Sequence, residues 1–238
     1  MLEVEVIRGT DGWLADRSVW TTPTDFPEIV EAIAAIERRA EITGLTGQHP
    51  IWEGYKDLPN YRKSKRDYRS SDQVRSSTSM CLMFAWLAAA RHSNAVIEIG
   101  AAFGISGMYW LSGLAEEEGW LFTFEANTIW ADLARDNLRA ISDRFTLVNG
   151  TFEEHADATL AGVGADIGVV DGFHTSDVVH AQLDILRRFL APGALVLIVG
   201  VNFSPDMIEC WRAISEDPSY AASAVIGPRV GLIELPRD

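Results

Sequence analysis

The chain has 238 residues, of which 47% are hydrophobic, and this length suits one α/β domain with an extension. Its formal net charge of −14 would repel a polyanion from most of the surface, so we expect neither DNA nor RNA as a substrate. No apolar run approaches the roughly 20 residues of a membrane-spanning helix, and the two distant cysteines, Cys81 and Cys210, form no disulfide framework, so we expect a cytoplasmic protein without a membrane partner.

The first part of the chain, residues 1–92, predicts a mainly helical extension with a lid. Apolar residues at helical spacing predict one helix over residues 28–41 and a second over residues 71–91. Between them, residues 44–71 contain two prolines, three tyrosines and one tryptophan. This composition predicts an ordered loop, and we expect it to cover the active site as a lid.

The second part, residues 93–238, alternates strand-like with helix-like segments. Short apolar runs predict strands at residues 95–99, 121–125, 145–149, 165–171, 194–199, 224–226 and 230–234. Helices are predicted at residues 105–118, 129–141, 175–190 and 205–216, with a further helical stretch from residue 153. This alternation predicts an α/β fold with a doubly wound, mainly parallel sheet, whose ligands bind at the carboxyl ends of the strands.

A glycine turn follows the first of these strands. Gly100 and Gly104 permit a tight turn and close approach of a ligand, and the helix that follows offers unpaired N–H groups. Glu125 ends the next strand, where an acid can accept hydrogen bonds from both hydroxyls of a ribose. The turn and the acid together predict a site for a nucleoside.

Five segments resemble, in the expected order, the motifs of class I S-adenosylmethionine-dependent methyltransferases. Residues 98–104 resemble motif I, E/D-x-G-x-G-x-G, although Ala102 replaces the middle glycine. Residues 124–126 resemble motif II, residues 149–152 resemble the segment that lines the adenine, and residues 166–174 resemble motif IV. The turn Pro192-Gly193 resembles the one before the fifth strand of the family.

This resemblance implies a fold, a cofactor and a set of binding residues. The fold is a Rossmann-like sheet of seven strands in the order 3-2-1-4-5-7-6, with the last strand antiparallel, and the cofactor is S-adenosylmethionine. Glu98, Gly100 and Ala102 would line its methionine end, Glu125 would hold the ribose, and Thr151 and Phe152 would border the adenine. The complete set of implied cofactor residues is Glu98, Gly100, Ala102, Gly104, Glu125, Ala126, Thr151, Phe152 and Asp171.

Asp171 and His174 are the candidate catalytic residues. Both follow the fourth strand of the second part, at the edge of the sheet where the sulfonium of the cofactor would lie. A carboxylate or an imidazole can orient a hydroxyl nucleophile or remove its proton, so O-methylation is favoured over N-methylation. The segment after Asp171 is similar to a bacterial branch with a D-G-x-H-[ST]-Y motif, which implies a small-molecule acceptor of unidentified structure.

The segment of residues 50–75 is expected to cover the active site and to supply the candidate acceptor contacts, Tyr68 and Arg75. Its aromatic residues suggest an aromatic or sugar-like pocket, and Arg75 would meet an anionic group. A basic cluster also lies in this segment, comprising Arg62, Lys63, Lys65, Arg66 and Arg69. The cluster is either a solvated loop or a clamp for a phosphate or carboxylate.

We expect no metal ion. Related catechol-type enzymes hold Mg²⁺ with several oxygen ligands, but Phe173 and Val201 stand where two of their carboxylates would be, which leaves Asp171 and Asn202. Three other functions remain open: a noncatalytic S-adenosylmethionine-binding protein, a nicotinamide-dependent oxidoreductase and a methyltransferase acting on macromolecules. The sequence also leaves a homo-oligomer open.

Overall fold

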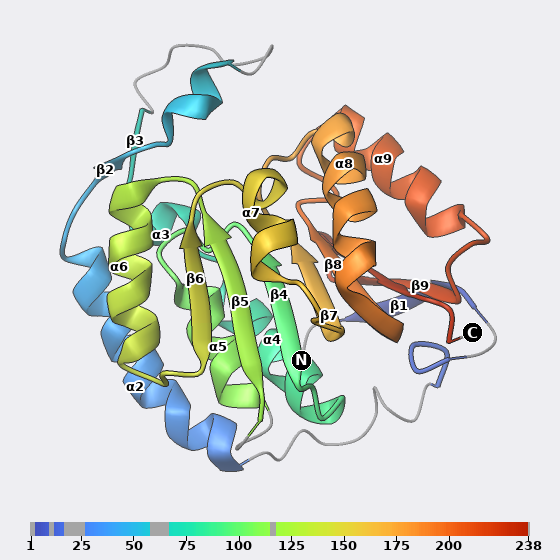
Figure 1. Ribbon diagram of the computed structural model, residues 1–238, viewed down its shortest axis with the longest axis horizontal. Helices are drawn as coiled ribbons and strands as arrows, with labels where there is room; N and C mark the ends of the chain where they lie inside the picture. The colour runs from blue at the N-terminus through green and yellow to red at the C-terminus, as the bar shows by residue number, and fades with distance from the viewer. Residues whose placement is uncertain (1–2, 10–11, 17–26, 58–66, 115–117, 238) are drawn as a thin grey trace.

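The computed structural model describes residues 3–9, 12–16, 27–57, 67–114 and 118–237 (Figure 1). An eight-stranded sheet forms its centre, in the order β1-β9-β10-β8-β7-β4-β5-β6. Its strands are β1 (Val4–Arg8), β4 (Ala95–Ile99), β5 (Trp120–Glu125), β6 (Phe145–Asn149), β7 (Ala165–Val170), β8 (Leu190–Val199), β9 (Ala222–Ile226) and β10 (Val230–Glu234).

The prediction of a seven-stranded sheet is wrong, because β1 adds an eighth strand next to β9. The strands from β4 to β8 pair in parallel, while β10 runs antiparallel to β8 and β9, as expected. In β1, Val4 pairs with Ile226, more than 200 positions away, in an antiparallel edge pairing. Only alternate residues of β1 are partly buried, as expected for an edge strand with one face against the core.

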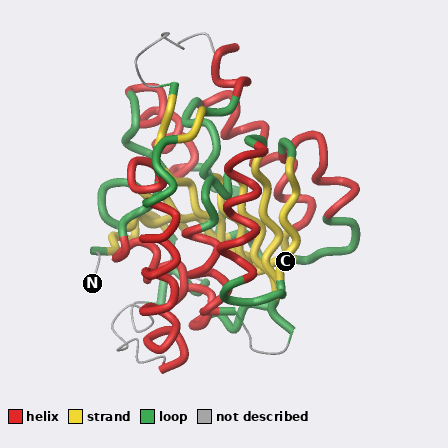
Figure 2. Tube along the Cα trace, turned by 90° about the vertical axis from the view of Figure 1, so that its left-hand side faces the viewer, coloured by secondary structure: helices red, strands yellow, loops and turns green. Residues whose placement is uncertain are grey.

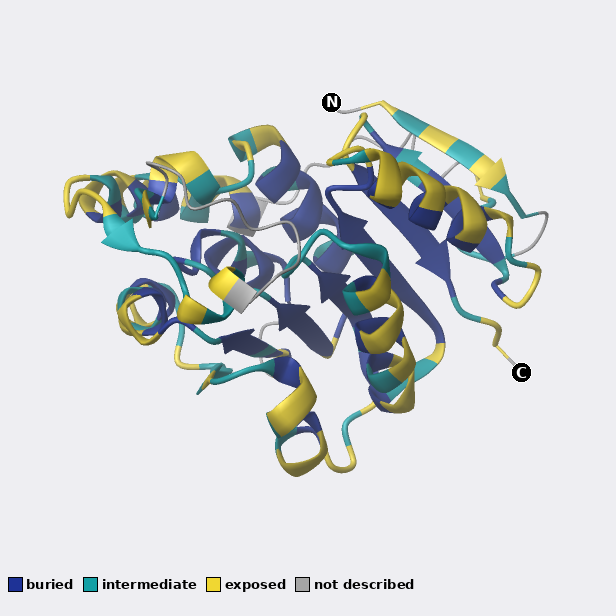
Figure 3. Cartoon of the chain, turned by 90° about the horizontal axis from the view of Figure 1, so that it is seen from above, coloured by how far each residue is buried: buried dark blue, intermediate teal, exposed yellow. Residues whose placement is uncertain are grey.

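Helices cover both faces of the sheet, as Figures 2 and 3 show. On one face lie α2 (Pro27–Gly44), α4 (Thr78–Ala90), α5 (Ile105–Gly113) and α6 (Thr128–Arg139). On the other face lie α7 (Phe152–Thr159), α8 (Ser176–Leu186) and α9 (Pro205–Glu216). Val96 and Ile97 point to opposite cores because side chains alternate along a strand, so β4 is buried on both faces. No helix in the described ranges is long and apolar enough to cross a membrane.

The helix predicted over residues 71–91 is two helices, α3 (Ser71–Val74) and α4. Arg75 is extended, with ψ near 145°, and Ser77 begins α4 by accepting a hydrogen bond from the N–H of Met80 at 3.3 Å. Serine competes for backbone hydrogen bonds at such positions and favours a helix start over a helix interior. The break matters for function because Val74, Arg75 and Ser76 line a cavity.

Two further boundaries differ from the prediction. Helix α5 ends at Gly113 and not at residue 118 as predicted. Gly113 packs closely against α4, since a Cβ at this residue would lie 2.0 Å from the carbonyl oxygen of Ala85. Strand β8 begins at Leu190, four residues before the predicted start at residue 194. The Pro192-Gly193 segment lies within this strand, where the pairing with β7 is irregular, and does not form a turn before it. The short helix η2 (Arg187–Phe189) separates α8 from β8.

A small strap lies beyond the carboxyl ends of the parallel strands (Figure 1). It contains β2 (His49–Pro50), η1 (Glu53–Asp57) and β3 (Tyr68–Arg69), with β2 and β3 paired antiparallel. Asn127 fixes the strap to the sheet, since its Nδ2 donates to the carbonyl of Pro50 at 2.7 Å while its Oδ1 caps α6. The His49 ring packs on Phe103, with ring centroids 5.8 Å apart. The strap occupies part of the segment that was predicted as a lid, and these contacts anchor it to the second part of the chain, residues 93–238.

Candidate active site

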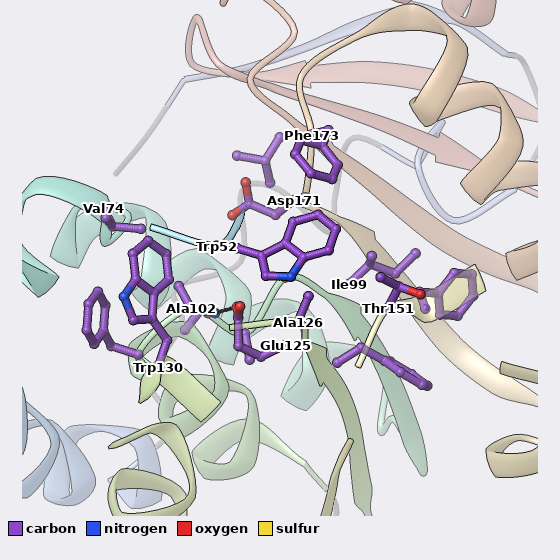
Figure 4. A pocket seen from close by; sticks show the side chains of 18 of the residues that line it. Trp52, Val74, Ile99, Ala102, Glu125, Ala126, Trp130, Thr151, Asp171 and Phe173 are labelled. Carbon is purple, nitrogen blue, oxygen red and sulfur yellow. Dashed lines mark hydrogen bonds between the residues drawn. The ribbon is translucent and has the colours of Figure 1, made fainter. Parts of the chain in front are cut away.

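A cavity lies at the carboxyl ends of β4, β5 and β7, beneath the strap (Figure 4). Most of the predicted site residues line it: Arg75, Gly100, Ala102, Glu125, Ala126, Thr151, Phe152, Asp171 and His174. Three of them do not, namely Tyr68, Glu98 and Gly104. Trp130 and Val74 occupy one end, Thr151 lies at the other, and Trp52 lies between them, above Glu125 (Figure 4).

The glycine turn forms the floor of the cavity. Gly100 has φ of +97°, and a Cβ there would lie 2.3 Å from the carbonyl oxygen of Asp171, so only glycine fits. Ala102 replaces the middle glycine of the motif and adopts φ of +46°, which the left-handed region allows at a small energetic cost. Gly104 serves packing, because a Cβ there would lie 2.9 Å from the Cα of Ala134 in α6.

Glu125 is held rigidly beside this turn and is only 8% exposed. Its Oε2 accepts the N–H of Ala102 at 2.8 Å, and its Oε1 accepts the N–H of Asn127 at 2.7 Å. Burial raises the pKa of Glu125 to about 7, although these two N–H groups act in the opposite direction. Each carboxylate oxygen keeps lone pairs for a ligand in the cavity.

Glu98 lies beneath the turn, where it is 2% exposed. Burial raises the pKa of Glu98 to about 7, and hydrogen bonds from Ser106 and Thr123 oppose the rise. The Thr123 hydroxyl donates to its Oε2 at 2.7 Å. Glu98 therefore supports the turn from behind, away from the cavity lining.

Phe152 and Gln182 lie at the far end of the cavity. Phe152 is 1% exposed and packs edge-on against Phe124, with centroids 5.1 Å apart, so it serves both core and cavity. Gln182 donates from Nε2 to Glu153 at 2.8 Å, while its Oε1 is buried without a partner among the described residues. The sequence prediction omitted Gln182 and Glu153, although a glutamine on the apolar face of α8 beside Leu183 was a usable signal.

Asp171 and His174 are brought together on the loop after β7. The Nε2 of His174 lies 3.5 Å from Oδ1 of Asp171, and this nitrogen is buried without an aligned hydrogen bond in the described structure. The imidazole stacks on Phe203, with centroids 4.8 Å apart. A Cβ at Gly200 would lie 2.0 Å from its Cδ2, so the ring fits only against glycine. The sequence prediction omitted Gly200 and Phe203.

Three aromatic side chains form a roof over the cavity. Phe173 packs against Tyr55 at 4.7 Å and against Trp52 at 5.5 Å between ring centroids. Burial raises the pKa of Tyr55 to about 12, and the nearby charges of Glu125 and Asp171 add to the rise. Tyr55 thus keeps its proton at neutral pH and contributes a neutral aromatic surface that excludes water.

The two predicted acceptor contacts on the lid differ in their placement. Arg75 lines the cavity, but its Nη2 lies 2.7 Å from Oε1 of Glu37, which also accepts the Tyr109 hydroxyl at 2.6 Å. Its charge is therefore already paired. Tyr68 is 54% exposed and lies outside the cavity lining. Of the basic cluster, only Arg69 falls in the described residues, since residues 62–66 lie outside them.

The described ranges contain no cluster of three His, Cys, Asp or Glu side chains that could hold a metal ion. Val201, at the position of a metal-binding carboxylate in the catechol-type pattern, is buried in the core at 4% exposure. Asp171 thus has His174 and the aromatic roof beside it, in place of further carboxylates.

A family model described as a methyltransferase domain matches residues 97–198, from β4 to the end of β8. No curated protein sequence matches the chain. The solved structure of cofactor-bound Rv0187 from MTB is 21% identical, with a TM-score of 0.60 over 92% of this chain and 93% of that chain. The family-model match therefore supports a methyltransferase domain over residues 97–198.

Two solved O-methyltransferases also share the fold. TomG from Streptomyces achromogenes, in complex with SAM, is 17% identical, with a TM-score of 0.59 over 89% of this chain and 91% of its own. The enzyme from Bacillus cereus, in complex with SAH, is 17% identical, with a TM-score of 0.60 over 84% of this chain and 89% of its own. These comparisons show a Rossmann-like methyltransferase fold that extends beyond the matched domain.

Proposed function

We propose that the protein is an S-adenosylmethionine-dependent methyltransferase that acts on an oxygen of a small molecule. The observation that carries the proposal is the arrangement of Glu125 beside the glycine turn, with Asp171 and His174 on the same cavity. A carboxylate at the end of β5 suits the two hydroxyls of a ribose. Bound S-adenosylmethionine would supply a methyl group on a sulfonium. The neutral thioether that remains after transfer, S-adenosylhomocysteine, would be an excellent leaving group.

The cavity offers a matching partner for each part of this cofactor. Gly100 leaves room for close approach of the methionine portion, Ala126 follows the ribose-binding Glu125, and Thr151 borders the adenine. The unpartnered Oε1 of Gln182 is an acceptor that suits the amino group of adenine. An orphaned buried acceptor of this kind favours a ligand that carries a donor.

His174 and Asp171 supply the chemistry on the acceptor side. The imidazole of His174 can accept the proton of an acceptor hydroxyl, and Asp171, whose Oδ1 lies 3.5 Å from Nε2, can stabilise the resulting imidazolium. The aromatic roof excludes water and holds a planar acceptor in line for the displacement. No step of this scheme needs a metal ion.

A titration calorimetry experiment tests the choice of cofactor. We expect S-adenosylmethionine and its demethylated product, S-adenosylhomocysteine, to bind with micromolar affinity, whereas NADH binds at least about a hundredfold more weakly. A nicotinamide-dependent enzyme would give the reverse order. Binding of both adenosyl compounds without turnover of any hydroxylated acceptor would favour the noncatalytic alternative.

The raised pKa of Glu125 predicts a pH dependence of cofactor binding. The ionised carboxylate is the stronger acceptor for ribose hydroxyls, and a pKa of about 7 leaves it about one-tenth ionised near pH 6 and nine-tenths ionised near pH 8. Affinity for S-adenosylhomocysteine should therefore rise about tenfold between these pH values. The variant Glu125→Gln should lose this rise, and a rise that persists unchanged in the variant would exclude Glu125 as its cause.

A further inference from the structure

We propose that the methyl acceptor is an aromatic hydroxy compound that carries a carboxylate, and that Arg229 binds this carboxylate. The inference rests on the proposed function and names the substrate class of the same site. It is carried by the acceptor corner, in which His174 and Arg229 line the cavity while Gly200 and Phe203 pack against the His174 ring.

Backbone hydrogen bonds place Arg229 in this corner. It lies in the turn between β9 and β10, and its carbonyl accepts the N–H of Gly200 at 2.8 Å and that of Val201 at 3.1 Å. Gly200 in turn packs directly against the His174 ring, and Arg229 and His174 line the same cavity. The backbone of Arg229 is therefore fixed beside Gly200, and its side chain starts close to the His174 ring.

Arg229 differs from the other cavity arginine in its charge balance. Arg75 is paired with Glu37, whereas Arg229 forms no ion pair with any described residue. Its side chain is exposed at the cavity mouth, in a chain whose net charge is −14. An unpaired guanidinium in such surroundings provides a local positive site, and its planar fork matches a carboxylate.

Phe203 provides the aromatic part of the subsite. Its ring stacks on His174, yet the residue remains 67% exposed. The N–H of Phe203 donates to the carbonyl of Gly200 at 2.9 Å, which holds the residue in the same corner as Arg229. An exposed ring beside the proposed base can pack against a planar acceptor, while Arg229 fixes a carboxylate at the ring edge. The acceptor hydroxyl then lies toward His174.

Binding to the protein saturated with S-adenosylhomocysteine tests this inference. The probes are 3,4-dihydroxybenzoate and 3,4-dihydroxycinnamate, each compared with its uncharged amide by calorimetry. We expect wild-type protein to bind each acid about tenfold more tightly than its amide, through a charge-assisted contact. The variant R229Q should bind acid and amide equally. The control R139Q removes the same charge from an exposed site on α6 and should keep the preference.

The outcomes separate this inference from the proposed function. Equal binding of acid and amide by the wild type, a preference that survives in R229Q, or no binding of any probe would overturn it, while S-adenosylhomocysteine still binds. Failure of S-adenosylhomocysteine to bind the wild type would instead overturn the proposed function. Unchanged affinity of R229Q for S-adenosylhomocysteine shows that the variant is folded.

Discussion

His174→Ala should lower kcat for methyl transfer by about 10²-fold or more, while affinity for S-adenosylhomocysteine should change little. The reason is that the imidazole of His174 lines the cavity beside Asp171, so it is placed to accept a proton from the acceptor hydroxyl. Steady-state kinetics with any hydroxylated acceptor that the wild type methylates gives kcat, and calorimetry gives the affinity.

The matched control for this variant is His180→Ala. His180 is an exposed histidine of α8 outside the cavity lining, so its loss should leave kcat unchanged. A chelator should also leave wild-type activity unchanged. Full activity in His174→Ala would exclude this histidine as the base, and activity lost in a chelator and restored by Mg²⁺ would replace the metal-free scheme, with Asp171 and Asn202 as ligands.

Glu125→Ala should weaken binding of S-adenosylhomocysteine by roughly 1–3 kcal/mol, which corresponds to a loss of about 5-fold to 150-fold in affinity. The buried carboxylate is the proposed acceptor for the ribose hydroxyls, and it also fixes the turn through the N–H of Ala102. Glu125→Gln keeps the size of the side chain and isolates the contribution of the charge.

Asp136→Ala is the control for this second variant, since it removes an exposed carboxylate of α6 away from the cavity. Its affinity should equal that of the wild type. Thermal unfolding of all three variants checks that the fold is retained. Wild-type affinity in Glu125→Ala would remove Glu125 from the cofactor site.

The central parallel strands β4, β7 and β8 could be predicted from sequence because they are largely buried on both faces and read as mainly apolar runs. The pairing of β1 with β9 could not, since it joins Val4 to Ile226 and leaves alternate residues of a short edge strand exposed. The break after α3 also escaped prediction. The apolar residues at helical spacing all lie in α4, and the capping serine, Ser77, marks where this helix begins.

In the candidate site, too, residues near strand ends could be predicted, whereas residues brought in by distant pairing could not. Glu125, Asp171 and His174 follow strands directly, so their place at the sheet edge could be expected from chain order. Arg229 reaches the cavity from a hairpin turn, while Phe203 lies on a loop beside His174, and their proximity depends on how β8 and β10 pair. Glu98 and Gly104 show the limit of carrying roles over by position, because packing places both outside the cavity lining.

A crystal structure of the protein with S-adenosylhomocysteine tests the central claim most directly. We expect the ribose hydroxyls within hydrogen-bond distance of the Glu125 carboxylate, the adenine beside Thr151 and Phe152, and the sulfur facing Asp171 and His174. A nucleoside bound elsewhere, or one whose sulfur faces away from these two side chains, would contradict the account.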